Sequence, residues 1–370
     1  MRKLKIAIIG VKGLPAIGGA ARANEALVKI LSNDYDITVY EISTHKSKVN
    51  TNLSYKSILF KGSPSKRFNT FAYYLKSCFH ALLKGDYDIV HTNHIYSGFI
   101  VPFLRIKFKV INTIRGIIPS DDNKWNIIDK FMFRIFEKTS LVFSNISVSV
   151  SKPQIKYLDS LTSKKVLFIP NGADIIESLL QERIVSKKDT LVFSAARIIK
   201  LKGCHTFLEA LQKIKYDKKI KIIGSLDHVE KYKQEILKLS RGLDVEFCDL
   251  ISEKRKLFSE LLTANYFVFP STKEGLSNML LEVASLNIPI ICSDIEENKA
   301  VFSDEEVLYF RTDDSDDLAK KIEFALNNPT VMQNLSQKAL EKLKSTYQWV
   351  SIASEYSKLY ESLNSSKTRF

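Results

Sequence analysis

The sequence predicts an α/β protein with two doubly wound domains, in which parallel β-sheets are covered by helices. Two observations support this prediction. Short apolar runs typical of buried strands alternate with helix-like segments along the 370-residue chain, and a βαβα alternation favours parallel sheets. The alternation also restarts near the middle of the chain, after Pro170, Asn171 and Gly172, which indicates a second domain of the same kind.

The first half of the chain begins with a buried strand, LKIAIIG (4–10). A helix is expected next, over ARANEALVKILSN (21–33), because its apolar residues recur at helical spacing. The later strands of this half are short and apolar: DITVYEI (36–42), DIVHTNH (88–94), KVINTI (109–114) and NISVSVS (145–151).

The second half repeats this order of elements. Its predicted strands are TLVFSAA (190–196), KIKIIGS (219–225), VEFCDL (245–250), NYFVFPST (265–272) and IPIICSD (288–294). Helical patterns lie between the strands, at TFLEALQKI (206–214), KYKQEILKLS (231–240), EKRKLFSELLTA (253–264) and about residues 277–286. A strand after every helix is the arrangement that a doubly wound sheet requires.

We expect a first domain at residues 1–168 and a second at residues 169–345, because PNGAD and the polar SKKD interrupt the alternation between them. The tail, residues 346–370, is predicted to be a helix that crosses back to the first domain. Its apolar residues recur at helical spacing: Trp349, Ile352, Tyr356 and Tyr360.

The composition is that of a soluble globular protein, with 45% hydrophobic and 26% charged residues. The four cysteines lie far apart and form no CxxC pair, which argues against a disulfide framework and favours a reducing cytosol. The apolar start is too short for a signal peptide. The longest apolar stretch, IYSGFIVPFL (95–104), is too short to span a bilayer.

The net charge of +14 is concentrated in one half of the chain. Residues 1–170 hold 26 Lys and Arg against 11 Asp and Glu, a net charge of +15, whereas residues 171–370 hold 29 against 30, a net charge of −1. Either a solvated basic surface or an anionic partner explains this asymmetry. Nucleic acid is disfavoured, because the basic half shows no aromatic–basic interleaving. A membrane leaflet is the expected anionic partner.

Two glutamates follow the strand NYFVFP in the stretch STKEGLSNMLLEVASLNIPIICSD (271–294). Glu274 lies in the loop at the carboxyl end of the strand, where open α/β sheets bind ligands. Gly275 and Leu276 continue this loop, and a glycine lets the backbone come close to a ligand. The first helix amides, near Ser277 and Asn278, can bind a phosphate.

Glu282 lies about a turn and a half down the same helix and can accept hydrogen bonds from sugar hydroxyls. The two carboxylates therefore fit a phosphosugar, with one acid for each sugar and a diphosphate between them. In the alternative interpretation, Glu274 caps the helix and Glu282 is a polar residue of an amphipathic helix.

A second loop, in FSAARIIKLKG (193–203), follows the first strand of the second domain. Arg197 and Lys202 lie there, near another helix start. Because a guanidinium forks onto phosphate and an ammonium acts as a point charge, the two together can neutralise a diphosphate. An isolated R-x4-K pattern is also common in solvated loops.

Taken in series, ARIIKLKG, FIPNGAD, the glutamate stretch and KGLPAIGGAARANEALVKIL resemble the family 4 retaining glycosyltransferases. The resemblance covers nearly the whole chain. It implies two Rossmann-like domains that face each other across a cleft, the GT-B type. It also implies that Glu274 holds the donor sugar and Glu282 the nucleotide ribose, and that Arg197 and Lys202 bind the diphosphate. Gly18 and Gly19 would line the acceptor side and approach the phosphates.

One position departs from the family pattern. Many relatives carry His in a T-x-H-G turn beside the transferred sugar, whereas this turn contains Arg115. A guanidinium cannot accept a proton, but it can hold phosphate or sugar oxygens. His91 and His94 end a strand at the same edge. A strand-end histidine is usually structural, and His94 is the one expected to touch substrate.

No metal or other cofactor is expected, apart from the nucleotide-sugar co-substrate. The DYD motifs at 34–36 and 86–88 resemble the metal-binding motif of other glycosyltransferases, but each comes before a strand and so lies away from the ligand edge. Arg197, Lys202 and the helix amides can instead carry the charge of the leaving group.

The expected function is transfer of a hexose from a nucleotide-diphosphate sugar, with UDP as the expected nucleotide, to a lipid-linked or oligosaccharide acceptor in cell-surface polysaccharide assembly. The expected location is the cytoplasm, at the inner face of the membrane.

Residues 63–85 are either an interfacial amphipathic helix or a surface helix that packs Phe71, Leu75 and Phe79 inward. The alternative functions are a nucleotide-sugar epimerase of the same fold and a catalytically silent partner of another transferase.

Overall fold

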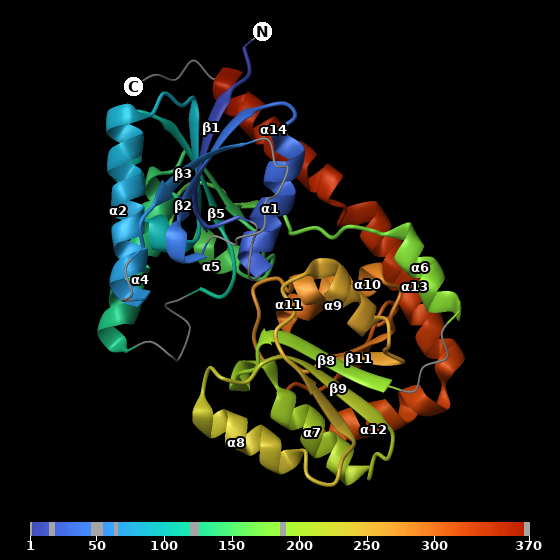
Figure 1. The fold of residues 1–370 in the computed structure, drawn as a ribbon. Coiled ribbons are helices and arrows are strands. Elements are labelled where there is room, and N and C mark those ends of the chain that lie inside the picture. Colours follow the sequence, from blue (N-terminus) through green and yellow to red (C-terminus); the bar gives the residue numbers. More distant parts are fainter. Residues whose placement is uncertain are drawn as a thin grey trace. The chain divides into compact units, whose positions relative to one another are not determined.

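The computed structural model describes residues 2–14, 19–45, 55–62, 66–118, 126–185 and 190–365. The chain forms two compact units, shown in Figure 1. Unit 1 consists of residues 1–171 together with residues 349–370, and unit 2 consists of residues 172–348. The predicted α/β class is confirmed, because each unit is built on one parallel sheet.

The sheet of unit 1 has seven strands in the order β3-β2-β1-β4-β5-β6-β7, and all neighbouring strands are parallel. The strands are β1 (Lys5–Lys12), β2 (Asp36–Ile42), β3 (Lys56–Phe60), β4 (Ile89–Asn93), β5 (Lys109–Ile114), β6 (Ile146–Ser149) and β7 (Leu167–Phe168). The order reverses between β1 and β4. In such sheets the carboxyl ends of the strands beside the reversal are where ligands bind.

The sheet of unit 2 has six parallel strands in the order β10-β9-β8-β11-β12-β13. They are β8 (Thr190–Arg197), β9 (Lys219–Ser225), β10 (Val245–Cys248), β11 (Tyr266–Phe269), β12 (Ile290–Ser293) and β13 (Leu308–Phe310). Here the order reverses between β8 and β11. The predicted Arg197 loop follows β8 and the predicted Glu274 loop follows β11, so both leave the sheet at its reversal point.

Helices connect the parallel strands, whereas the last three described helices follow the last strand, β13. Those of unit 1 are α1 (Gly19–Leu31), α2 (Lys66–Lys84), α3 (Val101–Leu104), α4 (Ile127–Phe143), α5 (Ile155–Asp159) and α14 (Trp349–Ser365), with 3₁₀ turns η1 (Ser43–His45) and η2 (Ile95–Ser97). Those of unit 2 are α6 (Glu177–Val185), α7 (Cys204–Lys213), α8 (Glu230–Leu239), α9 (Lys254–Leu261), α10 (Asn278–Ser285), α11 (Glu296–Lys299), α12 (Ser315–Asn327) and α13 (Pro329–Thr346), with the 3₁₀ turn η4 (Lys200–Lys202).

Two apolar cores cover the two faces of the unit 1 sheet, because successive strand residues point to opposite faces. Ile6 and Ile8 of β1 face α1 and α14, whereas Ala7 and Ile9 face α2. Helix α14 brings the end of the chain back to unit 1, and Figure 1 shows it beside α1. Burial of these apolar side chains is the main source of stability that the fold offers.

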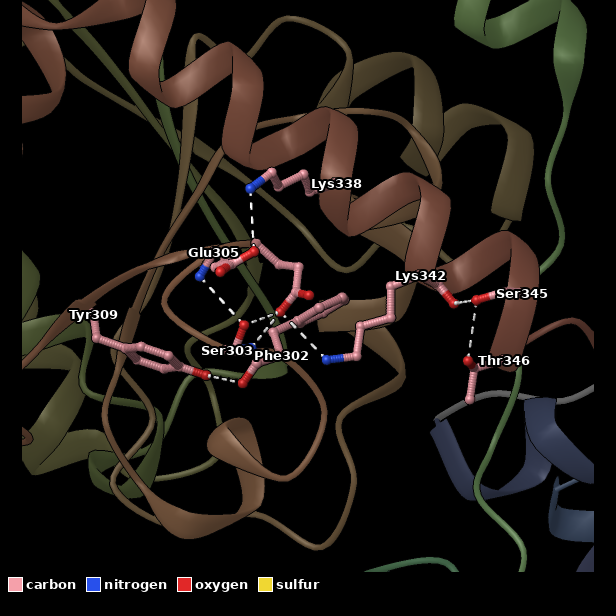
Figure 2. Close-up of polar contacts among 9 residues, drawn as sticks. Phe302, Ser303, Glu305, Tyr309, Lys338, Lys342, Ser345 and Thr346 are labelled. Carbon is pink, nitrogen blue, oxygen red and sulfur yellow. Dashed lines mark hydrogen bonds and ion pairs between the residues drawn. The ribbon is translucent and has the colours of Figure 1, made fainter.

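In unit 2, the segment before β13 is tied to α13 by ion pairs, which Figure 2 shows. Lys338 pairs with Glu305 at 3.1 Å, and Lys342 pairs with Glu306 at 3.3 Å. Glu306 also accepts hydrogen bonds from the backbone amide and hydroxyl of Ser303. The Lys338–Glu305 pair is exposed and contributes little by itself, whereas the Lys342–Glu306 pair is partly buried. Together the contacts fix the direction in which the chain enters β13.

Candidate active site

The η4 turn after β8 is held against the loop after β11. The Thr272 amide donates to the Leu201 carbonyl at 2.9 Å. Gly203 has a φ of 69°, and a Cβ at this position would lie 1.9 Å from the Pro270 carbonyl oxygen. Only glycine tolerates both the left-handed backbone and this close approach. The residue therefore brings the two loops into direct contact at the carboxyl edge of the sheet.

This contact joins two of the predicted site residues. Lys202 Nζ lies 2.5 Å from Glu274 Oε1. The Glu274 side chain is buried, and that of Lys202 is about a quarter exposed. The interpretation of Glu274 as a helix cap is wrong, because the hydroxyl of Ser277 caps α10 and accepts the Leu280 amide at 3.4 Å. The Glu274 carboxylate instead lies beside a cation at the edge where a ligand would bind.

Arg197 is the last residue of β8, and its side chain is exposed. Within the described part of the chain it forms no side-chain hydrogen bond or ion pair. Lys202 is paired with Glu274, whereas the Arg197 side chain remains available to an anionic ligand at this edge.

Glu282 is buried in α10, so it does not lie on a solvated polar face. A cation beside it is Lys254, whose Nζ lies 3.9 Å from Glu282 Oε1 and 2.9 Å from Asp174 Oδ2. A buried carboxylate beside a shared cation can accept hydrogen bonds from hydroxyl groups. Gly275 is buried, whereas Leu276, Ser277 and Asn278 are partly exposed, with Asn278 as the first residue of α10.

The sequence analysis missed a third carboxylate in this region. Glu297, in α11 after β12, has a pKa raised by burial and then by the negative charge of Glu274. A signal was present, because the segment SDIEEN also follows the carboxyl end of a strand. Glu297 is therefore a further acidic group close enough to Glu274 to be affected by its charge.

In unit 1, Gly18 lies outside the described residues, and Gly19 is the first residue of α1. At the end of the described segment that contains β1, the Leu14 amide donates to the buried Glu41 carboxylate at 2.7 Å. The amino end of α1 follows β1, beside the reversal of the strand order.

His91 is structural. It is buried, and its ring nitrogens lie 2.8 Å from the Tyr360 hydroxyl of α14 and 2.8 Å from Thr113 Oγ1. Burial lowers the pKa of His91 to about 3, with a smaller contribution from the charge of Arg115. The histidine stays neutral and holds α14 on the sheet.

His94 ends β4 in a strained conformation. Its φ of 70° and ψ of 152° belong to a region that is essentially restricted to glycine. Its amide donates to the Thr113 carbonyl at 2.9 Å, and its carbonyl accepts the Ser97 hydroxyl at 2.7 Å. Its Nδ1 lies 3.3 Å from the Arg115 carbonyl oxygen. Strained residues of this kind cluster at functional sites.

Arg115 follows β5 and is buried. Its Nε donates to Asn93 Oδ1 at 3.1 Å and its Nη1 to Asn171 Oδ1 at 2.5 Å. Thus unit 1 brings His94 and Arg115 together at the carboxyl edge of β4 and β5, while unit 2 brings together Arg197, Lys202 and Glu274.

The two DYD motifs lie at the amino ends of strands. Asp36 is the first residue of β2, and Asp88 directly precedes β4 and accepts the Lys5 amide at 2.9 Å. Across the described residues, no group of three or more His, Cys, Asp or Glu side chains is placed to hold a metal ion.

Several known glycosyltransferases are similar to this chain in sequence. WclY, an O-antigen biosynthesis glycosyltransferase of Escherichia coli, is 25% identical over 351 residues, which cover 91% of this chain and 93% of WclY. CapH, a capsular polysaccharide biosynthesis glycosyltransferase of Staphylococcus aureus, is 26% identical, over 77% of this chain and 80% of CapH. The N-acetylgalactosamine-N,N'-diacetylbacillosaminyl-diphospho-undecaprenol 4-alpha-N-acetylgalactosaminyltransferase of Campylobacter jejuni is 24% identical, over 93% and 95% of the two chains.

Two solved structures show the same fold. Sucrose-phosphate synthase from Thermosynechococcus elongatus superposes with a TM-score of 0.83 at 20% identity, over 98% of this chain and 99% of that one. HepE from Anabaena, in complex with UDP-glucose, superposes with a TM-score of 0.74 at 14% identity, over 97% and 100%. At these identities the likeness establishes the fold alone.

The model of the family "Glycosyl transferases group 1" matches residues 176–342, which lie in unit 2 and include Arg197, Lys202, Glu274 and Glu282. The match thus falls on the half of the chain that carries the paired cation and carboxylate at the sheet edge. Together with the full-length relatives, it shows that the chain belongs to the group 1, or family 4, glycosyltransferases and is an enzyme with the GT-B fold.

Proposed function

We propose that the enzyme transfers a hexose from a UDP-sugar to a lipid-linked acceptor in surface polysaccharide assembly, with retention of anomeric configuration. The observation that carries this proposal is the contact between Lys202 and Glu274, at the sheet edge where β8 ends in the exposed Arg197. A diphosphate needs cations and a sugar needs carboxylate acceptors, and this edge offers both. The Campylobacter jejuni relative supports the acceptor class, because its name describes a sugar linked to diphospho-undecaprenol. HepE supports the choice of nucleotide, because its structure was solved in complex with UDP-glucose.

In this proposal unit 2 binds the donor. Glu274 accepts hydrogen bonds from the sugar hydroxyls, and Glu282 accepts them from the ribose. Arg197, Lys202 and the first amides of α10, at Ser277 and Asn278, take the diphosphate, whose negative charge grows as it leaves. Preorganised donors of this kind stabilise the transition state more than the ground state. Gly275 and Leu276 form the loop that approaches the donor.

Unit 1 takes the acceptor in this proposal, and Gly18, Gly19 and His94 belong to its side of the reaction. Retention is expected from attack on the face that the diphosphate leaves, without a protein nucleophile. The epimerase alternative is weaker, because it requires an acid and a base around the sugar, and His91 is neutral and used in holding α14.

A release assay tests the function. Purified enzyme is incubated with a panel of nucleotide sugars, with and without a lipid extract, and free nucleoside diphosphate is measured. We expect release from a UDP-sugar that depends on the extract and continues in EDTA. Release that is lost in EDTA and restored by Mg²⁺ or Mn²⁺ would refute the assignment of the leaving-group charge to Arg197 and Lys202. Interconversion of sugars without release would establish the epimerase.

Arg197→Met is expected to weaken the binding of both the UDP-sugar and free UDP by about tenfold to a hundredfold, because a charge-assisted hydrogen bond contributes about 1.5–3 kcal/mol. Lys202→Met should weaken both as well. Arg241→Met, an equal change of charge at another exposed position of unit 2, is the control and should leave both affinities unchanged. Isothermal titration calorimetry checks this prediction, and unchanged UDP affinity in both site variants would show it to be wrong.

The location proposed for the enzyme is the cytoplasmic face of the membrane. Among the described helices, none is long and apolar enough to cross a bilayer. One face of α4 nevertheless carries large apolar side chains exposed to solvent, here called the α4 face: Ile127, Ile128, Phe131, Met132, Ile135, Val142 and Phe143. A contiguous exposed apolar surface of this kind usually marks an interaction site.

The apolar surface continues onto α2 through α3, which contacts both α2 and α4. Phe99 stacks on Phe71 of α2 with ring centroids 4.7 Å apart and lies 5.3 Å from Phe136 of α4. Further exposed apolar side chains extend this surface: Phe79, Leu83, Phe103 and Ile106. Packing of Phe71 and Phe79 inward, one of the two expectations for this helix, is wrong, because Phe71 is about half exposed and Phe79 is 61% exposed.

Basic residues accompany this apolar surface, with exposed Lys76 and Lys84 on α2 and exposed Arg134 and Lys138 on α4. Each basic residue near an anionic leaflet contributes about 1 kcal/mol, and apolar side chains that enter the interface add to this. The combination of charge and exposed apolar area fits an anionic leaflet. The protein is expected to bind anionic liposomes at low salt and to dissociate as salt screens the charges beyond about 8 Å.

Phe131→Ser should weaken liposome binding severalfold, whereas Phe324→Ser, at an exposed apolar position of unit 2, should not. Co-sedimentation with anionic and with zwitterionic liposomes, at low and at high salt, checks this prediction. Equal and negligible binding to both lipids at low salt would reject the membrane. A dimer that Phe131→Ser disrupts would assign the α4 face to a second copy of the chain.

A further inference from the structure

Arg115 is a buried cation without a carboxylate partner. Its side chain is only 5% exposed, at the carboxyl end of β5. Two of its nitrogens donate to the neutral amides of Asn93 and Asn171, and the third, Nη2, is buried without a hydrogen-bond partner among the described residues. In that part of the chain no Asp or Glu forms an ion pair with it.

The groups around Arg115 do not supply the missing negative charge. Asn93 uses Oδ1 to accept from Arg115 Nε, and its Nδ2 is itself buried without a partner. His91 is neutral, because burial and the charge of Arg115 lower its pKa to about 3. Tyr360, which bonds to His91, also stays neutral, because burial raises its pKa. A buried charge without a counterion is costly, so a fold that retains one usually meets an anion there.

From this arrangement we infer that Arg115 Nη2 and Asn93 Nδ2 form the binding site for a phosphate-class oxyanion on unit 1. A guanidinium presents donors in a planar fork that fits phosphate oxygens, and an amide N–H adds a further donor beside it. Nε and Nη1 are fixed by the two asparagines, so the side chain is preorganised with Nη2 left for the ligand. His94, strained and in contact with the Arg115 backbone, belongs to the same edge.

Phosphate at this site could come from the diphosphate of a lipid-linked acceptor or from that of a nucleotide. The inference deepens the proposed function, but it concerns binding alone and does not require sugar transfer. The opposing account is that Arg115 only braces Asn93 against Asn171. That account predicts a loss of stability when Arg115 is removed, and no change in the response to an oxyanion.

The test measures thermal unfolding with and without inorganic pyrophosphate. Pyrophosphate should raise the melting temperature of the wild type and of Arg134→Met, which removes an exposed charge from α4. In Arg115→Met the apparent affinity for pyrophosphate should fall by about tenfold or more, because a charge-assisted bond is lost. Parallel titrations with UDP and with farnesyl diphosphate tell the two sources apart, since the variant should lose affinity for the one that uses the site.

A second variant keeps the test decisive if Arg115→Met folds poorly. Asn93→Asp places a carboxylate beside Arg115 and retains the acceptor for Nε. The protein should then be more stable without ligand than the wild type, and its apparent affinity for pyrophosphate should fall as in Arg115→Met, because the internal carboxylate replaces the anion at this site. If both variants respond to pyrophosphate as the wild type does, the inference is wrong. A failure of UDP-sugar turnover alone would count against the proposed function and not against this site.

Discussion

Replacing Glu274 with glutamine is expected to lower the rate of sugar transfer by about a hundredfold or more, equivalent to about 2.7 kcal/mol of transition-state stabilisation. The carboxamide keeps the size of the side chain but loses its charge, and its NH₂ group cannot accept a hydrogen bond from a sugar hydroxyl. Lys202 would also lose the partner that positions it at 2.5 Å. The effect should therefore appear in kcat as well as in KM.

The control for this prediction is Glu341→Gln, an exposed carboxylate on α13 of the same unit, which should transfer sugar at the wild-type rate. Rates come from nucleoside diphosphate release with saturating acceptor, and circular dichroism verifies the fold of each variant. A Glu274→Gln enzyme within about threefold of the wild type, or about 0.7 kcal/mol, would remove Glu274 from the reaction.

Gly203→Ala is expected to destabilise unit 2 by about 3 kcal/mol or more, since the substitution combines left-handed strain with a steric clash. The added methyl group would lie 1.9 Å from the Pro270 carbonyl oxygen, and backbone atoms cannot move aside as a flexible side chain can. The η4 turn must then leave the loop that carries Glu274, so UDP affinity should fall as well.

Gly242→Ala is the matched control for this substitution. Gly242 also has a positive φ, 80°, but nothing lies within 4 Å of its added methyl group. Only the backbone strain remains, and it should cost about 1–2 kcal/mol. Urea unfolding, monitored by far-UV circular dichroism, compares the free energies of unfolding of the two variants. Equal losses of stability would show that the contact of η4 with Pro270 does not matter to the fold.

The sequence indicated candidate residues for the site but not the contacts between them. Arg197, Lys202 and Glu274 were identified because loops at the carboxyl ends of parallel strands meet at one edge. Their pairing depends on how closely η4 approaches Pro270, which no single-sequence pattern contains. Arg115 was visible as a departure from the family turn, but its burial without a counterion emerges only when the side chains that surround it are placed.

The inward face of α2 shows why apolar spacing alone could not decide between the two expectations for this helix. Tyr73 and Tyr74 are buried, and Phe79 is exposed. The buried face is chosen by hydrogen bonds as well as by hydrophobicity, because the Tyr73 hydroxyl accepts the Gly10 amide at 2.8 Å and donates to the Tyr40 carbonyl at 2.8 Å. Periodicity identifies a helix, but it cannot choose between two aromatic faces when one of them can satisfy buried backbone groups.

The return of α14 to unit 1 determines the order in which the newly made protein can fold. Unit 1 is encoded in two separate stretches, and unit 2 is complete before the ribosome reaches Trp349. At about 5–20 residues per second, the first stretch waits roughly ten seconds or more for its last helix. Until then the sheet face with Ile6 and Ile8 lacks the cover of α14. The nascent chain therefore exposes an apolar surface that chaperones can bind. Docking of α14 then covers this surface.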